Sequence, residues 1–455
     1  MPTCHVLVIG LGEVGQDVAR LLEREGHRVT AIDTHADAFQ KVADIDLDIV
    51  VGNGASPRLL REVNAANADL LVACTDNETV NLMSALIAKK FGTRQTVARL
   101  HHGDYEELVS KPSDELVEYP GVLGVDFVLN PSTLVAIEMI EIARNPGVLD
   151  LHVFAENKVE LAEIKIEENS ECCGRILSEI DFPEGVSIGA IIRTGKLFVP
   201  RGSDHFEAGD RLYVFGRRGQ LGSAVALFAP KFNISRVAMF GDERVGLGLA
   251  EGLNALGIQT MLLVDDREQA ERLADQLPTT EVLLGDGTDL NLLTEEQIGR
   301  YDLYFSVTDD DENNLISALL AKRLGVPRVG CLVHRPQVAD IYRDLGIDMI
   351  FCPRQIATDR ILSFAQTNAV SRVVHLQDGH AEVIELTAEK NSRITKSALK
   401  EQTLPEGVFI GGILRAGVAM IPNGESVVEA GDLVVVMTLS SQRKKAEKLF
   451  RGRSF

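Results

Sequence analysis

A glycine-rich turn near the N-terminus has the residue types and spacing that best fit a chemical role. It reads Gly10-Leu11-Gly12-Glu13-Val14-Gly15 and directly follows the apolar run 5–9. Here the first glycine permits a tight turn, the second lets backbone N–H groups approach a pyrophosphate, and the third lets a helix pack on the strand. Asp33, 18 residues after the last glycine, can accept hydrogen bonds from ribose hydroxyls. The pattern predicts a dinucleotide site; a Rossmann-type turn without ligand is the alternative.

Three further polar segments follow or end runs that read as strands. They are Asn53 in the loop 52–54, Thr75-Asp76, and Arg99. Because ligands bind at the carboxyl ends of parallel strands, the first two are candidates for closing over an adenosine, and Arg99 for pairing with a phosphate. Turn and N-cap roles for the first two, and an ion pair within the protein for Arg99, stay open.

A second copy of the glycine turn departs at its centre. It reads Gly241-Asp242-Glu243-Arg244-Val245-Gly246, with Glu243 in place of the middle glycine. That side chain should crowd and repel a pyrophosphate, although Arg244 offers partial compensation. The other polar positions are retained as Asp265, Asp286 and Thr308-Asp309. We therefore expect a second pocket that binds dinucleotide weakly or takes another ligand.

Signatures of catalysis are absent from the sequence. It contains no G-K-[ST], no Tyr-x-x-x-Lys and no H-E-x-x-H. His101, His102 and His334 could donate protons, but loop histidines usually make ordinary hydrogen bonds. We predict that the chain is not an enzyme. An NAD-dependent oxidoreductase is the main alternative, and a redox-sensing transcriptional regulator the next.

Composition narrows the class of protein. The 455 residues carry 46 Lys+Arg and 67 Asp+Glu, a formal net charge of −21, which argues against a broad nucleic-acid surface. No apolar run reaches the ~18 residues of a membrane-spanning helix, and the N-terminus reads as no signal peptide; the expectation is a cytoplasmic protein. The six cysteines show no metal spacing, and we expect no metal site.

Basic residues nevertheless gather near the C-terminus. A solvated helical face is the simplest interpretation, and contact with a membrane surface or a channel is the alternative. These residues are Arg443, Lys444, Lys445, Lys448, Arg451 and Arg453.

The elements that must position these residues are arranged in a duplication. Nine of 16 positions match between 75–90 and 308–323. PEGVSIG at 183–189 returns as PEGVFIG at 405–411, and EAGD occurs at 207–210 and 429–432. The plan is A–B–A′–B′, with predicted boundaries at residues 1–145, 146–230, 231–368 and 369–455.

Each A unit alternates apolar strands with helical patterns. In the first, strands are expected at 5–9, 28–33, 48–52, 69–75 and 95–100, with helices at 16–25 and 81–91. This order predicts a doubly wound, Rossmann-like parallel sheet. Each B unit, with strands such as 159–166 and 381–387, reads as a small α+β subdomain. Helical segments at 132–144 and 355–366 link A to B in each repeat.

With this plan and these loops, the chain resembles the TrkA family of bacterial potassium-uptake regulators, which carry two RCK (regulator of K⁺ conductance) repeats. The resemblance implies NAD(H) binding, with ATP or ADP as further ligands. It also implies homotetrameric gating rings and docking onto a Trk-type membrane potassium transporter at the inner face of the cell membrane. It does not imply catalysis, and the net charge already argues against nucleic acid as a partner.

The resemblance also assigns positions. In the first repeat it implies a nucleotide site at Gly10 through Val14, Asp33, Thr75-Asp76 and Arg99; in the second, at Gly241 through Val245, Asp265 and Thr308-Asp309. The chain departs from the family pattern at Glu243, where family members often have glycine. Its two repeats also differ from each other, because the first has Asn53 where the second has Asp286. The linking helices should pack the A units in pairs, whereas from sequence alone they could be local caps on their own sheets.

Overall fold

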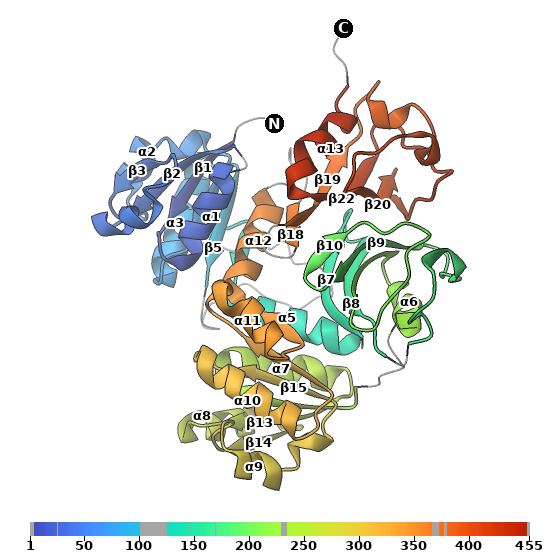
Figure 1. The fold of residues 1–455 in the computed structure, drawn as a ribbon. Helices are drawn as coiled ribbons and strands as arrows, with labels where there is room; N and C mark the ends of the chain where they lie inside the picture. Colours follow the sequence, from blue (N-terminus) through green and yellow to red (C-terminus); the bar gives the residue numbers. More distant parts are fainter. Residues whose placement is uncertain are drawn as a thin grey trace.

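The structure is a computed structural model that describes residues 4–24, 26–100, 125–145, 147–168, 170–228, 234–365, 373–376 and 380–452. Two subdomains with parallel sheets alternate along the chain with two smaller subdomains with antiparallel sheets (Figure 1). His101 and His102 lie outside the described residues. None of the described helices is long and apolar enough to cross a membrane.

The first parallel sheet has the strand order β3-β2-β1-β4-β5-β6, which confirms the predicted doubly wound architecture. Its order reverses between β1 and β4, which is where doubly wound sheets bind ligands. Asn77 and Ser56 cap the N-termini of α3 and α2 through their side-chain oxygens. The elements are β1 (His5–Ile9), α1 (Glu13–Arg24), β2 (Arg28–Asp33), β3 (Asp48–Val51), α2 (Pro57–Glu62), β4 (Leu70–Ala73), α3 (Glu78–Phe91), β5 (Gln95–Arg99) and β6 (Phe127–Leu129).

The second parallel sheet repeats this topology as β14-β13-β12-β15-β16-β17. Its elements are β12 (Arg236–Gly241), α7 (Glu243–Ala255), β13 (Gln259–Val264), α8 (Arg267–Gln276), β14 (Thr280–Leu284), α9 (Leu290–Glu295), β15 (Leu303–Val307), α10 (Asp311–Arg323), β16 (Arg328–Leu332), α11 (Ala339–Asp344) and β17 (Met349–Phe351).

The small subdomains are five-stranded antiparallel sheets, ordered β10-β9-β11-β8-β7 and β18-β19-β22-β20-β21. They share one apolar core, in which the Phe215 and Phe409 rings stack with centroids 5.8 Å apart. Their elements are β7 (Val148–Phe154), β8 (Val159–Lys165), β9 (Val186–Arg193), β10 (Lys196–Phe198), β11 (Arg211–Arg217) and α6 (Leu221–Phe228), then β18 (Val373–Leu376), β19 (Ala381–Thr387), β20 (Val408–Arg415), β21 (Val418–Met420), β22 (Leu433–Leu439) and α13 (Arg443–Phe450).

The repeated EAGD motif has a structural explanation. Its aspartate is buried in both copies and pairs with an arginine that ends a neighbouring strand, Arg193 Nη2 to Asp210 Oδ2 and Arg415 Nη2 to Asp432 Oδ2, each at 2.7 Å. The same carboxylate accepts a hydrogen bond from the backbone N–H of the motif's glutamate. The motif thus closes a turn against the sheet.

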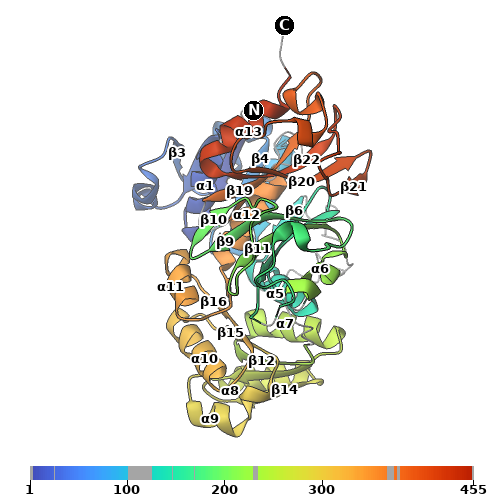
Figure 2. The same ribbon diagram turned by 45° about the vertical axis from the view of Figure 1, so that its right-hand side comes forward.

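The linking helices α5 (Pro131–Arg144) and α12 (Pro353–Ala365) each pack on the other repeat. Apolar side chains of α5 belong to the core of the second parallel sheet, and those of α12 to the core of the first. Both views show α5 beside α7 and α12 beside α1 (Figures 1 and 2). The predicted pairing of A units is confirmed within one chain, and the interpretation as local caps is wrong.

Candidate nucleotide site

The first glycine turn is shaped by close approach of backbone to backbone. Gly10 has φ +89°, and a Cβ on it would lie 2.7 Å from Thr75 Cγ2. A Cβ on Gly15 would lie 1.9 Å from the Gly10 carbonyl oxygen. A Cβ on Gly12 would meet nothing within 4 Å. The first and third glycines are therefore required by packing, while the middle one leaves open space above the turn, as a ligand approaching the backbone requires.

Asp33 holds this turn against β2. Its Oδ2 accepts a hydrogen bond of 2.7 Å from the Leu11 N–H, and its Oδ1 accepts one of 2.9 Å from the His35 N–H. An ionised carboxylate offers about four acceptor sites. Asp33 therefore keeps capacity to accept from ribose hydroxyls while it positions the glycine turn.

Asn81 organises the site, and our sequence analysis did not single it out. It is fully buried on α3. Its Oδ1 accepts from the N–H and the hydroxyl of Thr75, and its Nδ2 donates to the carbonyls of Thr75 and Arg99, all within 2.9 Å. Asn81 thereby ties the ends of β4 and β5 together. The signal was present, because Asn314 is the matching asparagine in the duplicated segment.

Arg99 is the last residue of β5, and its side chain is partly buried. Its Nε is buried and makes no hydrogen bond within the described chain. Burial lowers the pKa of Arg99 from its ordinary value, while the nearby Cys74, Asp76 and Glu13 act in the opposite direction. Because a buried donor without an acceptor is unfavourable, this group fits a phosphate arriving at the carboxyl edge of the sheet.

The other predicted residues of the first repeat have simpler contacts. Asn53 Oδ1 accepts from the Ala55 N–H at 2.9 Å, which is the turn role left open from sequence. Asp76 is exposed. Glu13 is largely exposed at the start of α1, with its Oε2 3.9 Å from Arg354 Nη1 of α12.

The second glycine turn is closed by its own ion pairs. Arg244 Nη2 lies 2.6 Å from Asp242 Oδ2 and also bonds Asp309 Oδ2, which joins the ends of β12 and β15. Glu243, in place of the middle glycine, pairs with Arg272 of α8 at 3.3 Å. The charged groups at this turn thus satisfy one another.

Strand register corrects one predicted equivalence. Ile9 lies opposite Ile32, and Phe240 lies opposite Leu263 in the same register. The residue equivalent to Asp33 is therefore Val264, which is buried, and Asp265 comes one position later. The expectation that Asp265 repeats the role of Asp33 is wrong, because the retained acid lies beyond the strand end.

The same reasoning applies to Arg99. Asn81 donates to the Arg99 carbonyl at 2.9 Å, and Asn314 donates to the Leu332 carbonyl at 3.0 Å. Leu332 thus stands where the first repeat has Arg99. The second repeat thus differs from the first at three of the positions predicted for the nucleotide site, namely the middle glycine, the acid at the end of the second strand and the arginine. Asp286 also differs from Asn53; its Oδ1 accepts from the Thr288 N–H at 2.8 Å.

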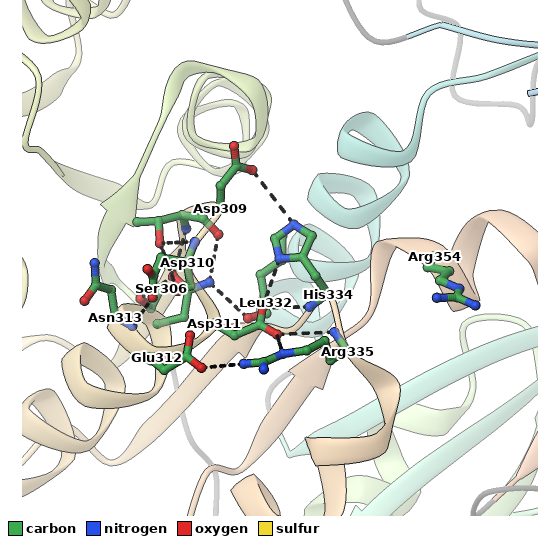
Figure 3. A network of polar contacts seen from close by, with 12 residues as sticks. Ser306, Asp309, Asp310, Asp311, Glu312, Asn313, Leu332, His334, Arg335 and Arg354 are labelled. Carbon is green, nitrogen blue, oxygen red and sulfur yellow. Dashed lines mark hydrogen bonds and ion pairs between the residues drawn. The ribbon is translucent and has the colours of Figure 1, made fainter. Parts of the chain in front are cut away.

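A polar network lies at the carboxyl ends of β15 and β16, beside the start of α10 (Figure 3). His334 donates its backbone N–H to Asp311 Oδ1 at 2.8 Å, and its Nδ1 lies 2.9 Å from the same oxygen. Burial alone would raise the pKa of Asp311, but hydrogen bonds from His334 and Arg335 outweigh it and lower the pKa. Figure 3 shows Asp309 reaching the other side of the His334 ring, 3.9 Å from Nε2. His334 therefore ties the end of β16 to the start of α10.

Comparison with known families identifies the duplicated units. The TrkA-N domain matches residues 6–130 and 237–353, and the TrkA-C domain matches residues 161–229 and 383–451. The chain belongs to the TrkA family. It is 30% identical over 448 residues to a Trk system potassium uptake protein TrkA homolog of Archaeoglobus fulgidus, spanning 98% of this chain and 100% of that protein. It is 31% identical over 467 residues to Trk system potassium uptake protein TrkA of Haemophilus influenzae, spanning 99% of each.

Solved structures share the fold. The GsuK RCK domain aligns with a TM-score of 0.60 at 17% identity, covering 98% of this chain and 95% of that one. The GsuK channel bound to NAD aligns with a TM-score of 0.61 at 17% identity, covering 98% and 79%. The predicted family and the tandem-repeat fold are confirmed. These relatives are named as potassium uptake proteins and not as enzymes, in agreement with the prediction that this chain is not an enzyme.

Proposed function

We propose that this chain is the nucleotide-sensing subunit of a potassium-uptake system. NAD(H) binds at the first glycine turn, with ATP or ADP as competing ligands. The chain works as a homotetrameric ring docked on a Trk-type membrane transporter, at the inner face of the membrane. The TrkA family and the names of its relatives support this role, as does the GsuK channel, which shares the fold and is described as bound to NAD.

The observation that carries the proposal is the difference between the two glycine turns. The first has an open middle glycine, an acid at the end of β2 and an arginine whose Nε lacks a partner among the described residues. The second has Glu243, Val264 and Leu332 at these positions and an ion pair across its mouth. We expect one dinucleotide per chain. In that site Gly10, Gly12 and the start of α1 would hold the pyrophosphate, Asp33 the ribose, and Arg99 a phosphate.

Occupancy of this site can reach the second repeat through a short path. The glycine turn opens α1, and Asp17 on α1 accepts hydrogen bonds from Arg354 on α12, with 2.5 Å between Arg354 Nη2 and Asp17 Oδ1. In the order of described elements, α12 is followed by β18 of the second small subdomain. A ligand that moves α1 therefore acts on the angle between the paired units, provided that it binds the two arrangements with different affinities.

The test is a calorimetric titration of the full chain with NADH, NAD, ATP and ADP. We expect one NADH per chain, and still one after Glu243→Gly, because Val264 and Leu332 remain. Two NADH sites in the parent chain would contradict the assignment. If the chain bound none of these nucleotides, the proposed sensing role would be refuted. Regulation is tested separately: potassium flux through a reconstituted complex should depend on the nucleotide supplied, and flux that ignores it would refute gating.

A further inference from the structure

A cationic hollow lies in the second small subdomain, far in sequence from either glycine turn. Its volume is about 580 Å³, within the range of small-molecule sites. It lies between the segment 391–405 and α13. None of the described residues that line it is acidic; they are Asn391, Arg393, Lys396, Pro405, Lys445, Lys448, Leu449 and Arg451. Arg453, which the sequence analysis grouped with these cations, lies outside the described residues.

The cations of the hollow are largely without acidic partners. Within the part of the chain that the structure describes, Lys396, Lys445 and Lys448 form no ion pair, and Arg393 donates only to the Thr403 carbonyl, at 3.2 Å. Arg451 reaches Glu447 at 3.6 Å. Like charges so gathered repel one another. In a chain of net charge −21, an uncompensated positive hollow points to an anion as its counterpart.

The first small subdomain provides an internal comparison. Thr387 pairs with Leu433 as Lys165 pairs with Arg211, which fixes an offset of 222 residues between the two copies. At that offset the five cations of the hollow correspond to Glu171, Gly174, Ser223, Ala226 and Ala229. The same fold therefore forms without a single one of these charges, and folding does not require them.

The hollow rests on a tethered frame. The Glu389 N–H donates to the Phe450 carbonyl at 2.9 Å, and the Gly452 N–H donates to Glu389 Oε2 at 2.7 Å. These bonds join the loop after β19 to the end of α13. Leu449 is buried against the subdomain core, which places the basic face of α13 opposite Arg393 and Lys396 across the hollow. The backbone segments that carry these charges are thus joined to one another before a ligand arrives.

We propose that this hollow is a second ligand site, which binds a soluble phosphorylated anion carrying two or three phosphates. Five cations match the charge of a di- or triphosphate, and the apolar Leu449 and Pro405 offer a surface for the remainder of such a molecule. We favour a soluble ligand over lipid headgroups because the cations line a concavity. A site on a bilayer presents its cations outward.

The experiment titrates the full chain with inorganic tripolyphosphate by calorimetry, in the presence of saturating NADH. The variant Lys445→Ser/Lys448→Ala/Arg451→Ala restores the residue types of the first subdomain. The control Arg58→Ala/Lys90→Ala/Lys196→Ala removes three exposed cations elsewhere. We expect the hollow variant to lose at least tenfold in tripolyphosphate affinity, with unchanged NADH affinity, and the control to stay within twofold. Lys448→Ala alone, expected to lose several-fold, keeps the test valid if the triple variant does not fold.

Three outcomes would overturn the proposal. The hollow variant and the parent could bind tripolyphosphate equally, or the control could lose as much affinity as the hollow variant. The third outcome is hollow-dependent binding to phosphatidylglycerol vesicles, but not to phosphatidylcholine vesicles, without any binding of tripolyphosphate. That result would make the hollow a membrane contact.

Discussion

At the residue scale, Arg99 is the side chain on which nucleotide affinity should depend most. We predict that Arg99→Leu weakens NADH binding by about 10- to 100-fold, because a charge-assisted hydrogen bond contributes about 1.5–3 kcal/mol. Leucine is the matched substitution, since Leu332 occupies the equivalent position in the second repeat. The variant should fold at least as stably as the parent, because a buried guanidinium is replaced by an apolar group. NADH affinity unchanged in calorimetry would exclude Arg99 from the site.

Glu138, on α5, gives the chain a predicted pH dependence. Burial, with the charge of Asp150, raises the pKa of Glu138 from 4.5 to about 8. Between these values the unfolded chain has released a proton that the folded protein keeps, so stability falls as the pH rises from about 4.5 to 8. Glu138→Gln should match the parent at pH 4.5 and exceed it at pH 9 by up to several kcal/mol, at about 1.4 kcal/mol for each pH unit between the two pKa values.

Thermal unfolding at several pH values checks this prediction. The control is Glu141→Gln, which removes an exposed ion pair with Arg144 one turn further along the same helix. That change should shift the melting temperature little and almost equally at each pH. A Glu138→Gln variant whose advantage over the parent does not grow with pH would show that Glu138 is ionised in the folded protein.

The residues also show how far the sequence could lead. The glycine turn and Asp33 were predictable, because their roles depend on spacing between a strand and the helix that follows. The equivalence of Asp265 was not, because matching by residue type accepts any nearby acid, whereas strand register selects Val264. That Leu332 replaces the arginine becomes clear only from the hydrogen bonds that Asn81 and Asn314 make to the equivalent carbonyls of Arg99 and Leu332. That the Nε of Arg99 is buried without a hydrogen-bond partner among the described residues could not be predicted, because a sequence motif carries no information on burial.

At the scale of elements, α5 and α12, which each pack on the other repeat, make chemically different contacts there. Helix α5 approaches α7 at glycine: a Cβ on Gly252 would lie 2.1 Å from Ile140 Cδ1. Helix α12 packs on α1 through apolar side chains and adds the Arg354–Asp17 ion pair. Both linking helices were predictable from periodicity. Their exchange was expected only from the family resemblance, because an apolar helix face does not specify which sheet covers it. The ionic contact is the one next to the nucleotide turn.

We predict that Arg354→Ala uncouples α12 from the nucleotide site. In the parent, NADH should slow hydrogen exchange in α12 as well as in α1; in the variant only α1 should respond. The loss of a partly buried pair should also lower stability by about 1–2 kcal/mol. Arg343→Ala, which removes an exposed pair with Asp340 on α11, is the control and should retain the response of α12. An equal response of α12 to NADH in the parent and in Arg354→Ala would place the coupling elsewhere.

At the scale of the whole molecule, the exchange makes each half of the chain incomplete. Helix α5 buries Val135, Met139 and Ile142 in the core of the second repeat. Exposing them would be unfavourable by on the order of 5 kcal/mol, which is comparable to the stability of a small domain. The first half also contains a surface on which such a helix can pack, because the face of α1 that contacts α12 in the full chain would be exposed in the fragment.

The first half alone should therefore form a symmetric dimer. We predict that residues 1–230 associate by placing α5 of each copy on α1 of the other, reproducing between two chains the packing that the full chain makes internally. Sedimentation equilibrium should give twice the mass of the fragment. Met139→Asp, which puts a charge on the exchanged face, should yield monomers of reduced stability. A monomeric fragment with cooperative unfolding would show that each half covers its own helix, and that the pairing in the full chain depends on the link between its repeats.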